Sequence, residues 1–155
     1  MAEKPAHRID PTPCTCSALR RAARHVSSIY DRHLASEGLR VSQYAILATL
    51  GRLGRLSINE LARSMVMDRT TLGRALRPLQ RDGLVAIATG SDARTRQAGL
   101  TPVGADRLRS AKQRWSEAQA DFDASFGADD CADLKSLLHR AVTVTDRPMQ
   151  DALQH

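Results

Sequence analysis

The sequence predicts a mainly α-helical fold with one small β hairpin. Two helix-start signals follow one another within residues 57–71, and a short β-branched run comes after them at residues 84–89. Amphipathic helical patterns flank this region on both sides. We therefore expect two short adjacent helices, a hairpin and longer helices outside them.

The two short helices are predicted from their capping residues. Ser57-Ile-Asn-Glu60 matches a capping box, in which the Ser57 hydroxyl accepts from the Glu60 amide while the Glu60 carboxylate accepts from the Ser57 amide. A second helix should start at Asp68, whose carboxylate can accept from free amides at the helix N-terminus. Its expected apolar face is Leu72, Ala75, Leu76 and Leu79. Pro78 has no amide hydrogen, so we expect a bent helix or a break at Arg77.

The hairpin is predicted from residues 84 to 101. Gly83 can end the second helix, and the run Leu-Val-Ala-Ile-Ala-Thr at residues 84–89 is suited to a strand. Gly90-Ser91-Asp92 predicts the turn that follows. A second short run returning towards Thr101 would place Arg94 and Arg96 at the tip of the hairpin.

Outer helices are predicted before and after this core. A helical pattern at about residues 16–36 ends near Gly38, and Ser42 is the expected cap of the next helix. Thr101 followed by Pro102 predicts the start of a long helix, and another follows it. The terminal helices have more apolar surface than the hairpin can cover, which predicts pairing with a second copy of the chain.

These patterns predict a domain organisation. We expect a flexible arm at residues 1–13 and a single domain at residues 14–155. Within that domain the core should span about residues 42–101. The dimerisation helices should span about residues 16–36 and 101–146.

Composition favours an anionic partner. The chain has 155 residues, a formal net charge of +6 and 42% hydrophobic residues, and three of its 23 basic residues are lysine, so 20 are arginine. Arginine has a forked donor group that suits phosphates and guanine edges, although an arginine-rich proteome would give the same bias. The sequence lacks a run of about eighteen apolar residues and a secretory apolar region, so we expect no membrane span and a cytoplasmic protein.

Two stretches resemble a known family. The run from Met67 to Val85 (MDRTTLGRALRPLQRDGLV) is similar to the recognition helix of MarR-type winged helix-turn-helix regulators. Asp92-Ala-Arg94 followed by Leu100-Thr101-Pro-Val-Gly104 is similar to the wing of that family, the wing being its β hairpin. The resemblance covers about residues 18–144. It implies a winged helix-turn-helix core with N- and C-terminal dimerisation helices, and a homodimer on a pseudo-palindromic operator in double-stranded DNA.

DNA contact is the expected role of the second motif helix and the wing. In the major groove, base edges should lie nearest Arg69, Thr70, Thr71 and Arg74, with Arg77 at a phosphate. Arg94 and Arg96 should reach the minor groove or its phosphates, with Asp92 holding Arg94. Ser57 and Asn59 are candidates for phosphate contacts. The alternative is that these side chains only form a solvated helix face.

The cysteines suggest a second, redox role. Cys16 stands where a peroxide-sensing branch of the family has its reactive cysteine, and Tyr30 follows fourteen residues later, as in that branch. Arg20 replaces a second tyrosine of that branch, so the resemblance is partial. A helix N-terminus close to arginines favours the thiolate, the form that peroxide attacks. The alternative is that Cys14 and Cys16 are inert.

Three functions from different classes remain open. They are a DNA-binding repressor released by a small-molecule effector or by thiol oxidation, a thiol redox protein that uses Cys14 and Cys16 without specific DNA binding, and a helical interaction module. Trp115, Tyr44 and Phe122 could line an effector cleft or belong to the core. No motif or residue set predicts an enzyme, a cofactor or a metal site. The wing pattern supports only the repressor.

Overall fold

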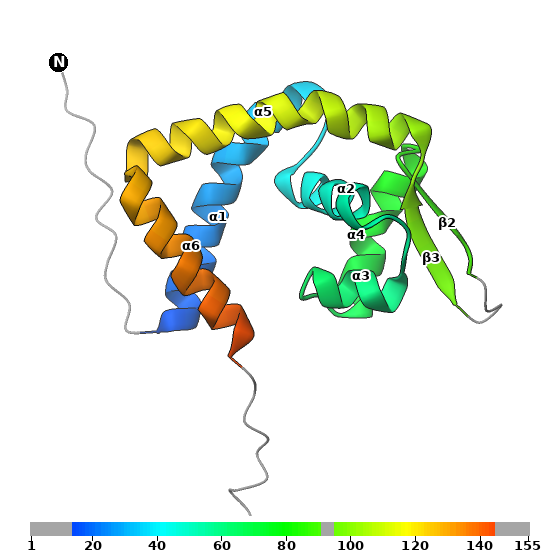
Figure 1. Cartoon of the computed structure of the whole chain (residues 1–155), viewed down its shortest axis with the longest axis horizontal. Coiled ribbons are helices and arrows are strands. Elements are labelled where there is room, and N and C mark those ends of the chain that lie inside the picture. The colour runs from blue at the N-terminus through cyan, green and yellow to red at the C-terminus, as the bar shows by residue number, and fades with distance from the viewer. Residues whose placement is uncertain (1–13, 91–94, 145–155) are drawn as a thin grey trace, which may run out of the picture. The chain divides into compact units, whose positions relative to one another are not determined.

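The computed structural model describes residues 14–90 and 95–144. Its elements in chain order are α1 (Thr15–Leu34), the 3-10 helix η1 (Ala35–Glu37), α2 (Val41–Leu53), β1 (Leu56–Ser57), α3 (Ile58–Ser64), α4 (Arg69–Arg81), β2 (Val85–Thr89), β3 (Arg96–Leu100), α5 (Pro102–Phe126) and α6 (Ala128–Thr143) (Figure 1). The chain forms two compact units, and the boundary falls within α5, between Ala118 and Gln119. The mainly helical fold with a small sheet agrees with the prediction.

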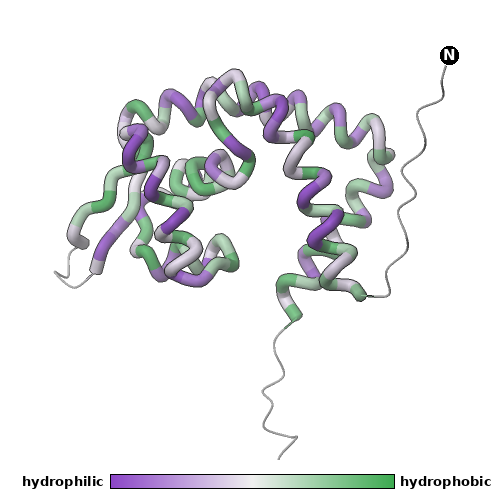
Figure 2. Tube along the Cα trace, turned by 180° about the vertical axis from the view of Figure 1, so that it is seen from behind, coloured by the Kyte–Doolittle hydropathy of each residue, from purple (hydrophilic) through white to green (hydrophobic). Residues whose placement is uncertain are grey.

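The core of the first unit is built from one apolar face of each helix. Hydrophobic and hydrophilic residues alternate along the helices of this unit (Figure 2). The largest fully buried side chains are Leu34, Ile46, Leu47, Leu61, Leu72, Leu76 and Leu79. Burying one such side chain contributes about 1.5–3 kcal/mol. The predicted inner face of α4 is therefore firmly held, and the opposite face of the helix is left to solvent.

Both predicted starts of the short helices are confirmed. The Ser57 hydroxyl accepts from the Glu60 amide at 3.2 Å, and the Glu60 carboxylate accepts from the Ser57 amide at 2.8 Å. At the start of α4, the Asp68 carboxylate accepts from the Thr71 amide at 2.8 Å and from the Thr71 hydroxyl at 2.6 Å. Local side chains therefore fix where α3 and α4 begin.

The predicted break at Arg77 is wrong, because α4 continues through Pro78 to Arg81. Pro78 costs the helix only one amide hydrogen bond, and few residues remain after it. The Pro78 carbonyl still accepts from the Asp82 amide at 2.9 Å, and the Leu79 carbonyl accepts from the Leu84 amide at 2.8 Å. Gly83 then ends the helix in the left-handed conformation, with φ of 70°.

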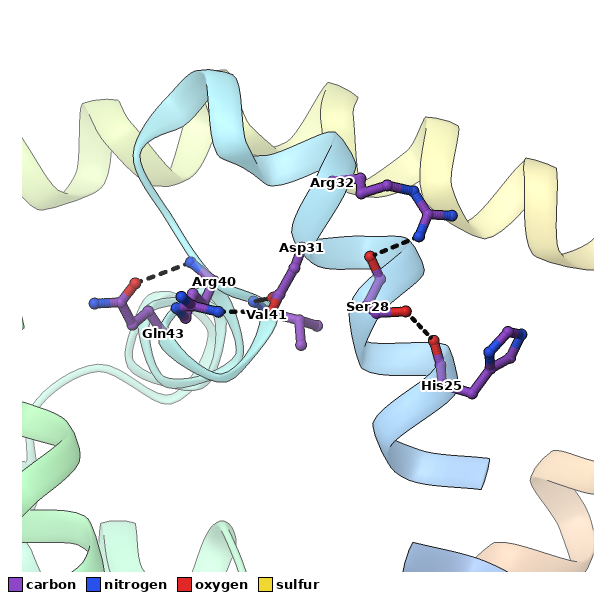
Figure 3. A network of polar contacts seen from close by, with 7 residues as sticks. All are labelled: His25, Ser28, Asp31, Arg32, Arg40, Val41 and Gln43. Atoms are coloured by element: carbon purple, nitrogen blue, oxygen red, sulfur yellow. Dashed lines mark hydrogen bonds and ion pairs between the residues drawn. The ribbon is translucent and has the colours of Figure 1, made fainter. Parts of the chain in front are cut away.

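The start of α2 also differs from the prediction. The helix begins at Val41 after the capping residue Arg40, not after Ser42. The cap comes from α1, where the Asp31 carboxylate accepts from the Val41 amide at 2.7 Å and pairs with the Arg40 guanidinium at 3.3 Å (Figure 3). The local part of this start is Gln43, whose side-chain oxygen accepts from the Arg40 amide at 2.9 Å. Asp31 lies ten residues before the amide that it caps, and Arg40 is not a typical capping residue, so the sequence around Arg40 did not mark the start.

The sheet is antiparallel, with strand order β1-β3-β2. The predicted hairpin is present, and Val85 and Ile87 of β2 pair with Leu100 and Ala98 of β3. The short third strand β1 was not predicted, because two residues are too few to show an alternating pattern. The turn at residues 91–94 lies outside the described residues, and with it Asp92 and Arg94.

The junction between the wing and α5 explains the Leu100–Gly104 pattern. The Thr101 hydroxyl donates to the Gly83 carbonyl at 2.6 Å and accepts from the Gly104 amide at 2.9 Å. A Cβ at residue 104 would collide with the backbone carbonyl of Leu84. The predicted cap at Thr101 is confirmed, and Gly104 is required because the first turn of α5 lies directly against the chain entering β2.

The second unit contains the end of α5, from Gln119, and α6. Phe122 stacks on Phe126 with ring centroids 5.3 Å apart. Burial and a hydrogen bond with the Asp123 carboxylate raise the pKa of the Cys131 thiol. Much of the apolar face of α6 is nevertheless open to solvent, since Leu137 is 55% exposed and Val142 61%.

Candidate nucleic-acid interface

A groove lies along the exposed face of α4, beside the wing. Its volume is about 520 Å³. The apolar residues Ile58, Leu76 and Ile87 contribute part of its lining, together with Gly73. The polar part of the lining is Arg69, Thr70, Arg74, Arg77, Gln80 and Arg96.

The charged residues that line the groove are all basic. Arg69, Arg74, Arg77 and Arg96 are all exposed, and no acidic residue of the described part of the chain lines the groove. Among residues 14–90 and 95–144, none of these four arginines forms an ion pair. Arg81 on the same helix instead donates to Asp82 at 3.0 Å. The groove thus offers four exposed guanidinium groups to an anionic partner.

The structure brings together five of the predicted DNA-contacting residues. Arg69, Thr70, Arg74, Arg77 and Arg96 line the groove. The other three described candidates do not line it: the Thr71 hydroxyl is turned towards Asp68, Ser57 caps α3, and Asn59 is exposed in the first turn of α3. Asp92 and Arg94 lie outside the described residues.

Five lining residues were not predicted as site residues from the sequence. They are Leu76, which was predicted only for the inner face of the helix, and Ile58, Gly73, Gln80 and Ile87. Gly73 and Gln80 follow the helical spacing of Arg69 and Arg77, so extending that face of α4 would have found them. Ile58 and Ile87 come from α3 and β2. Nothing local in the sequence shows that these two residues reach the same groove.

The thiols predicted to be redox-active lie at the head of α1. Cys14 is the residue before the helix and Cys16 lies in its first turn, and both side chains are exposed. Tyr30 is buried on the same helix, about 21 Å further along the axis from Cys16 at 1.5 Å per residue. The fold of one chain therefore does not bring Tyr30 to Cys16. Within the described ranges, no three His, Cys, Asp or Glu side chains are placed to hold a metal ion.

Two of the three aromatic candidates for an effector cleft pack in the core of the first unit. Tyr44 stacks on Trp115 with ring centroids 5.9 Å apart. Tyr44 is buried, which raises the pKa of its hydroxyl, and Trp115 packs against the same hydrophobic cluster. The core interpretation of this pair is the one that the structure supports.

The comparisons with known proteins identify the family. Residues 39–87 match the model of the MarR family. The structure of the M. tuberculosis transcriptional regulator MosR in complex with DNA is 36% identical to this chain, with a TM-score of 0.69, and the match covers 83% of this chain and 98% of MosR. The chain belongs to the MarR family.

Further MarR-like structures share the fold. A probable transcriptional regulator from Pseudomonas aeruginosa is 25% identical, with a TM-score of 0.75 and coverage of 83% of this chain and 97% of that one. A mutant MarR from E. coli, complexed with operator DNA, is 20% identical, with a TM-score of 0.73 and coverage of 81% and 91%. No curated protein matches the chain in sequence.

The family and the fold are those of a DNA-binding transcriptional regulator. None of the helices within residues 14–90 and 95–144 combines the length and apolar character needed to cross a bilayer.

Proposed function

We propose that this MarR-family protein is a homodimeric repressor whose two α4 helices bind a pseudo-palindromic operator. The observation that carries the proposal is the groove with its four exposed arginines along one face of α4. A dimer with recognition helices about 34–36 Å apart would meet successive major grooves on one side of the duplex. Occlusion of a promoter is the simplest way in which such a complex regulates transcription.

In this proposal the groove residues divide by role. Arg69, Thr70 and Arg74 face base edges in the major groove, and Arg77 contacts a phosphate. Thr71 offers its methyl group, because its hydroxyl donates to Asp68. Arg96, which pairs with Thr89 in the last strand pair before the turn of the wing, contacts the minor groove or its backbone.

The remaining candidates keep peripheral roles in the proposal. Asn59 is exposed at the start of α3 and is assigned to a phosphate, while Ser57 positions that helix through its capping bonds. Arg94, with Asp92 as its support, is assigned to the wing contact on the family resemblance.

The dimer is supported by apolar side chains that a single chain leaves in solvent. Leu19 on α1 is 40% exposed, and Leu137 and Val142 on α6 are more than half exposed. Exposed apolar side chains on two helices are typical of surfaces that a second subunit covers. Binding of two half-sites by one dimer then multiplies the affinity of each.

Release from the operator is proposed to follow an effector or thiol oxidation. Peroxide would convert the Cys16 thiol to sulfenic acid, with reduction of the peroxide O–O bond, and a second thiol such as Cys14 would then displace water to form a disulfide. Both thiols are exposed, as this chemistry requires. A ring at the head of α1 would disturb a helix that carries part of the proposed dimer surface.

A peroxide titration distinguishes the two modes of release. The protein bound to its operator is oxidised beside the Cys14→Ser and Cys16→Ser variants. We expect the parent to lose DNA and Cys16→Ser to retain it. If all three respond alike, the thiol switch is rejected and a small-molecule effector is the remaining mode.

DNA binding itself is tested with duplex DNA from upstream of the chain's own gene, at about 50 and 200 mM salt. Arg74→Ala should weaken operator binding by about 1–3 kcal/mol and relax the preference at one base position. Arg81→Ala is the matched control, because Arg81 lies on α4 outside the groove and pairs with Asp82. Equal losses for both variants, or equal affinity of the parent for operator and random DNA, would contradict the proposal.

A further inference from the structure

Gly73 is an unusual residue for its position. It is the fifth residue of the 13-residue helix α4, well inside the helix. After proline, glycine is the least favourable residue in a helix interior, because it loses most conformational freedom on folding. A glycine retained there should have a compensating reason, either within the protein or outside it.

The described part of the chain supplies no such reason for Gly73. Of the nine glycines in the chain, four have positive φ, namely Gly38, Gly54, Gly83 and Gly127. At Gly51, Gly90, Gly99 and Gly104 an added Cβ would lie 3.0 Å or less from a neighbouring atom. Gly73 has neither property, since its φ is not positive and a Cβ would meet no described atom within 4 Å. An alanine would therefore fit the folded chain and favour the helix.

The open space beside Gly73 is the arginine-lined groove. Gly73 lies four residues after Arg69 and four before Arg77, so the three form one ridge along the exposed face of α4. The two arginines stand about 12 Å apart along the helix axis, at 1.5 Å per residue. Gly73 lies midway between them, where the helix backbone itself forms part of the groove surface.

We propose that Gly73 is a specificity-determining residue, whose missing side chain lets the α4 backbone approach a base edge in the major groove. The proposal rests on the proposed function and deepens it. Arg69 and Arg77 fix the position of α4 on the duplex on either side of residue 73. The helix therefore cannot shift along the duplex to make room for a side chain at that position. A methyl group at residue 73 would hold the helix away from the bases that Arg69 and Arg74 are proposed to read.

The test is Gly73→Ala, measured for thermal stability and for binding to the upstream duplex and to a random duplex of equal length. We expect a higher Tm, because alanine favours the helix. Operator affinity should fall about tenfold, the size of one mismatched base pair, while affinity for random DNA changes much less. Ser116→Ala, an exposed position of α5 outside the groove, is the matched control: it should also favour its helix and leave operator binding unchanged.

Two results would overturn the inference. One is operator binding by Gly73→Ala equal to that of the parent. The other is a lower Tm, which would show that glycine serves the fold. The failure of the proposed function can be told apart from these results. If the parent has no preference for the upstream duplex over random DNA, both the proposed function and the role of Gly73 are rejected. If the parent and Gly73→Ala prefer the upstream duplex equally, only the role of Gly73 is rejected.

Discussion

The Asp68 carboxylate controls the start of α4, the proposed recognition helix. It accepts hydrogen bonds from the hydroxyl and the amide of Thr71, and these bonds hold the pKa of Asp68 below its ordinary value of 3.8. The same bonds orient the side chain of Thr71, which does not line the groove. Asp68 therefore sets both where the helix begins and how one of its surface residues is turned.

The lowered pKa gives a pH dependence with a definite sign. The unfolded chain takes up the proton on Asp68 at a higher pH than the folded chain, so the stabilisation is fully present above pH 3.8 and is lost as the pH falls through the lower, folded value. We expect the Tm to fall as the pH is lowered from about 5 to about 3. Asp68→Asn keeps a good capping residue that does not titrate, so its Tm should fall less.

The control for this experiment is the start of α3. The Ser57 hydroxyl and, to a smaller extent, the Ser57 amide, which donates to the Glu60 carboxylate at 2.8 Å, also lower the pKa of Glu60. Glu60→Gln should therefore flatten a separate part of the pH profile. Identical profiles for the parent and Asp68→Asn would mean that the carboxylate of Asp68 does not contribute to the acid sensitivity of the fold.

At the scale of elements, the hydrogen bonds between helices determine how α1 is attached to α2. Asp31 on α1 caps α2 by accepting from the Val41 amide and pairs with Arg40, whose side chain is 77% exposed. A helix cap contributes about 0.5–2 kcal/mol, whereas an exposed ion pair contributes about 0–1 kcal/mol. The hydrogen bond from the Val41 amide to Asp31 is therefore the stronger of the two interactions. Through it, a helix that bears part of the proposed dimer surface is tied directly to the core that carries the groove.

Contacts between residues far apart in the chain could not be predicted from the sequence. The starts of α3, α4 and α5 were predictable, because Ser57, Asp68 and Thr101 each cap amides a few residues away. The start of α2 and the strand β1 were not, because Asp31 and the partner strand β3 lie far from them in the chain. The site shows the same division: the arginines of α4 were found from helical spacing, whereas Ile58 and Ile87 join the groove only through the tertiary fold.

At the scale of the whole molecule, each unit leaves apolar side chains in solvent. In the first unit, the buried residues of α1 are Tyr30 and Leu34 alone, and Leu19 remains 40% exposed. In the second unit, Leu137 and Val142 of α6 are 55% and 61% exposed. A protein that reads a two-fold symmetric operator would use such residues to join two copies. A substitution that prevents dimerisation should then also lower the affinity for the operator.

Leu137→Glu tests this link. A charge in a subunit interface is strongly unfavourable, while at an exposed position of a single chain it changes folding stability little. We expect the parent to sediment as a dimer at micromolar concentration and Leu137→Glu as a monomer. The monomer should lose about 10²–10⁴-fold in operator affinity, because two linked half-site contacts become independent.

Leu53→Glu is the matched control, because Leu53 is also an exposed apolar residue, at 47%, but it is the last residue of α2, outside both the predicted dimerisation helices and the groove. It should sediment and bind as the parent does. A monomeric parent would contradict the dimer, and a Leu137→Glu variant that stays dimeric would place the interface elsewhere. A monomeric Leu137→Glu that still binds the operator as tightly as the parent would show that α4 and the wing of one chain are sufficient, and that the second half-site contributes nothing to affinity.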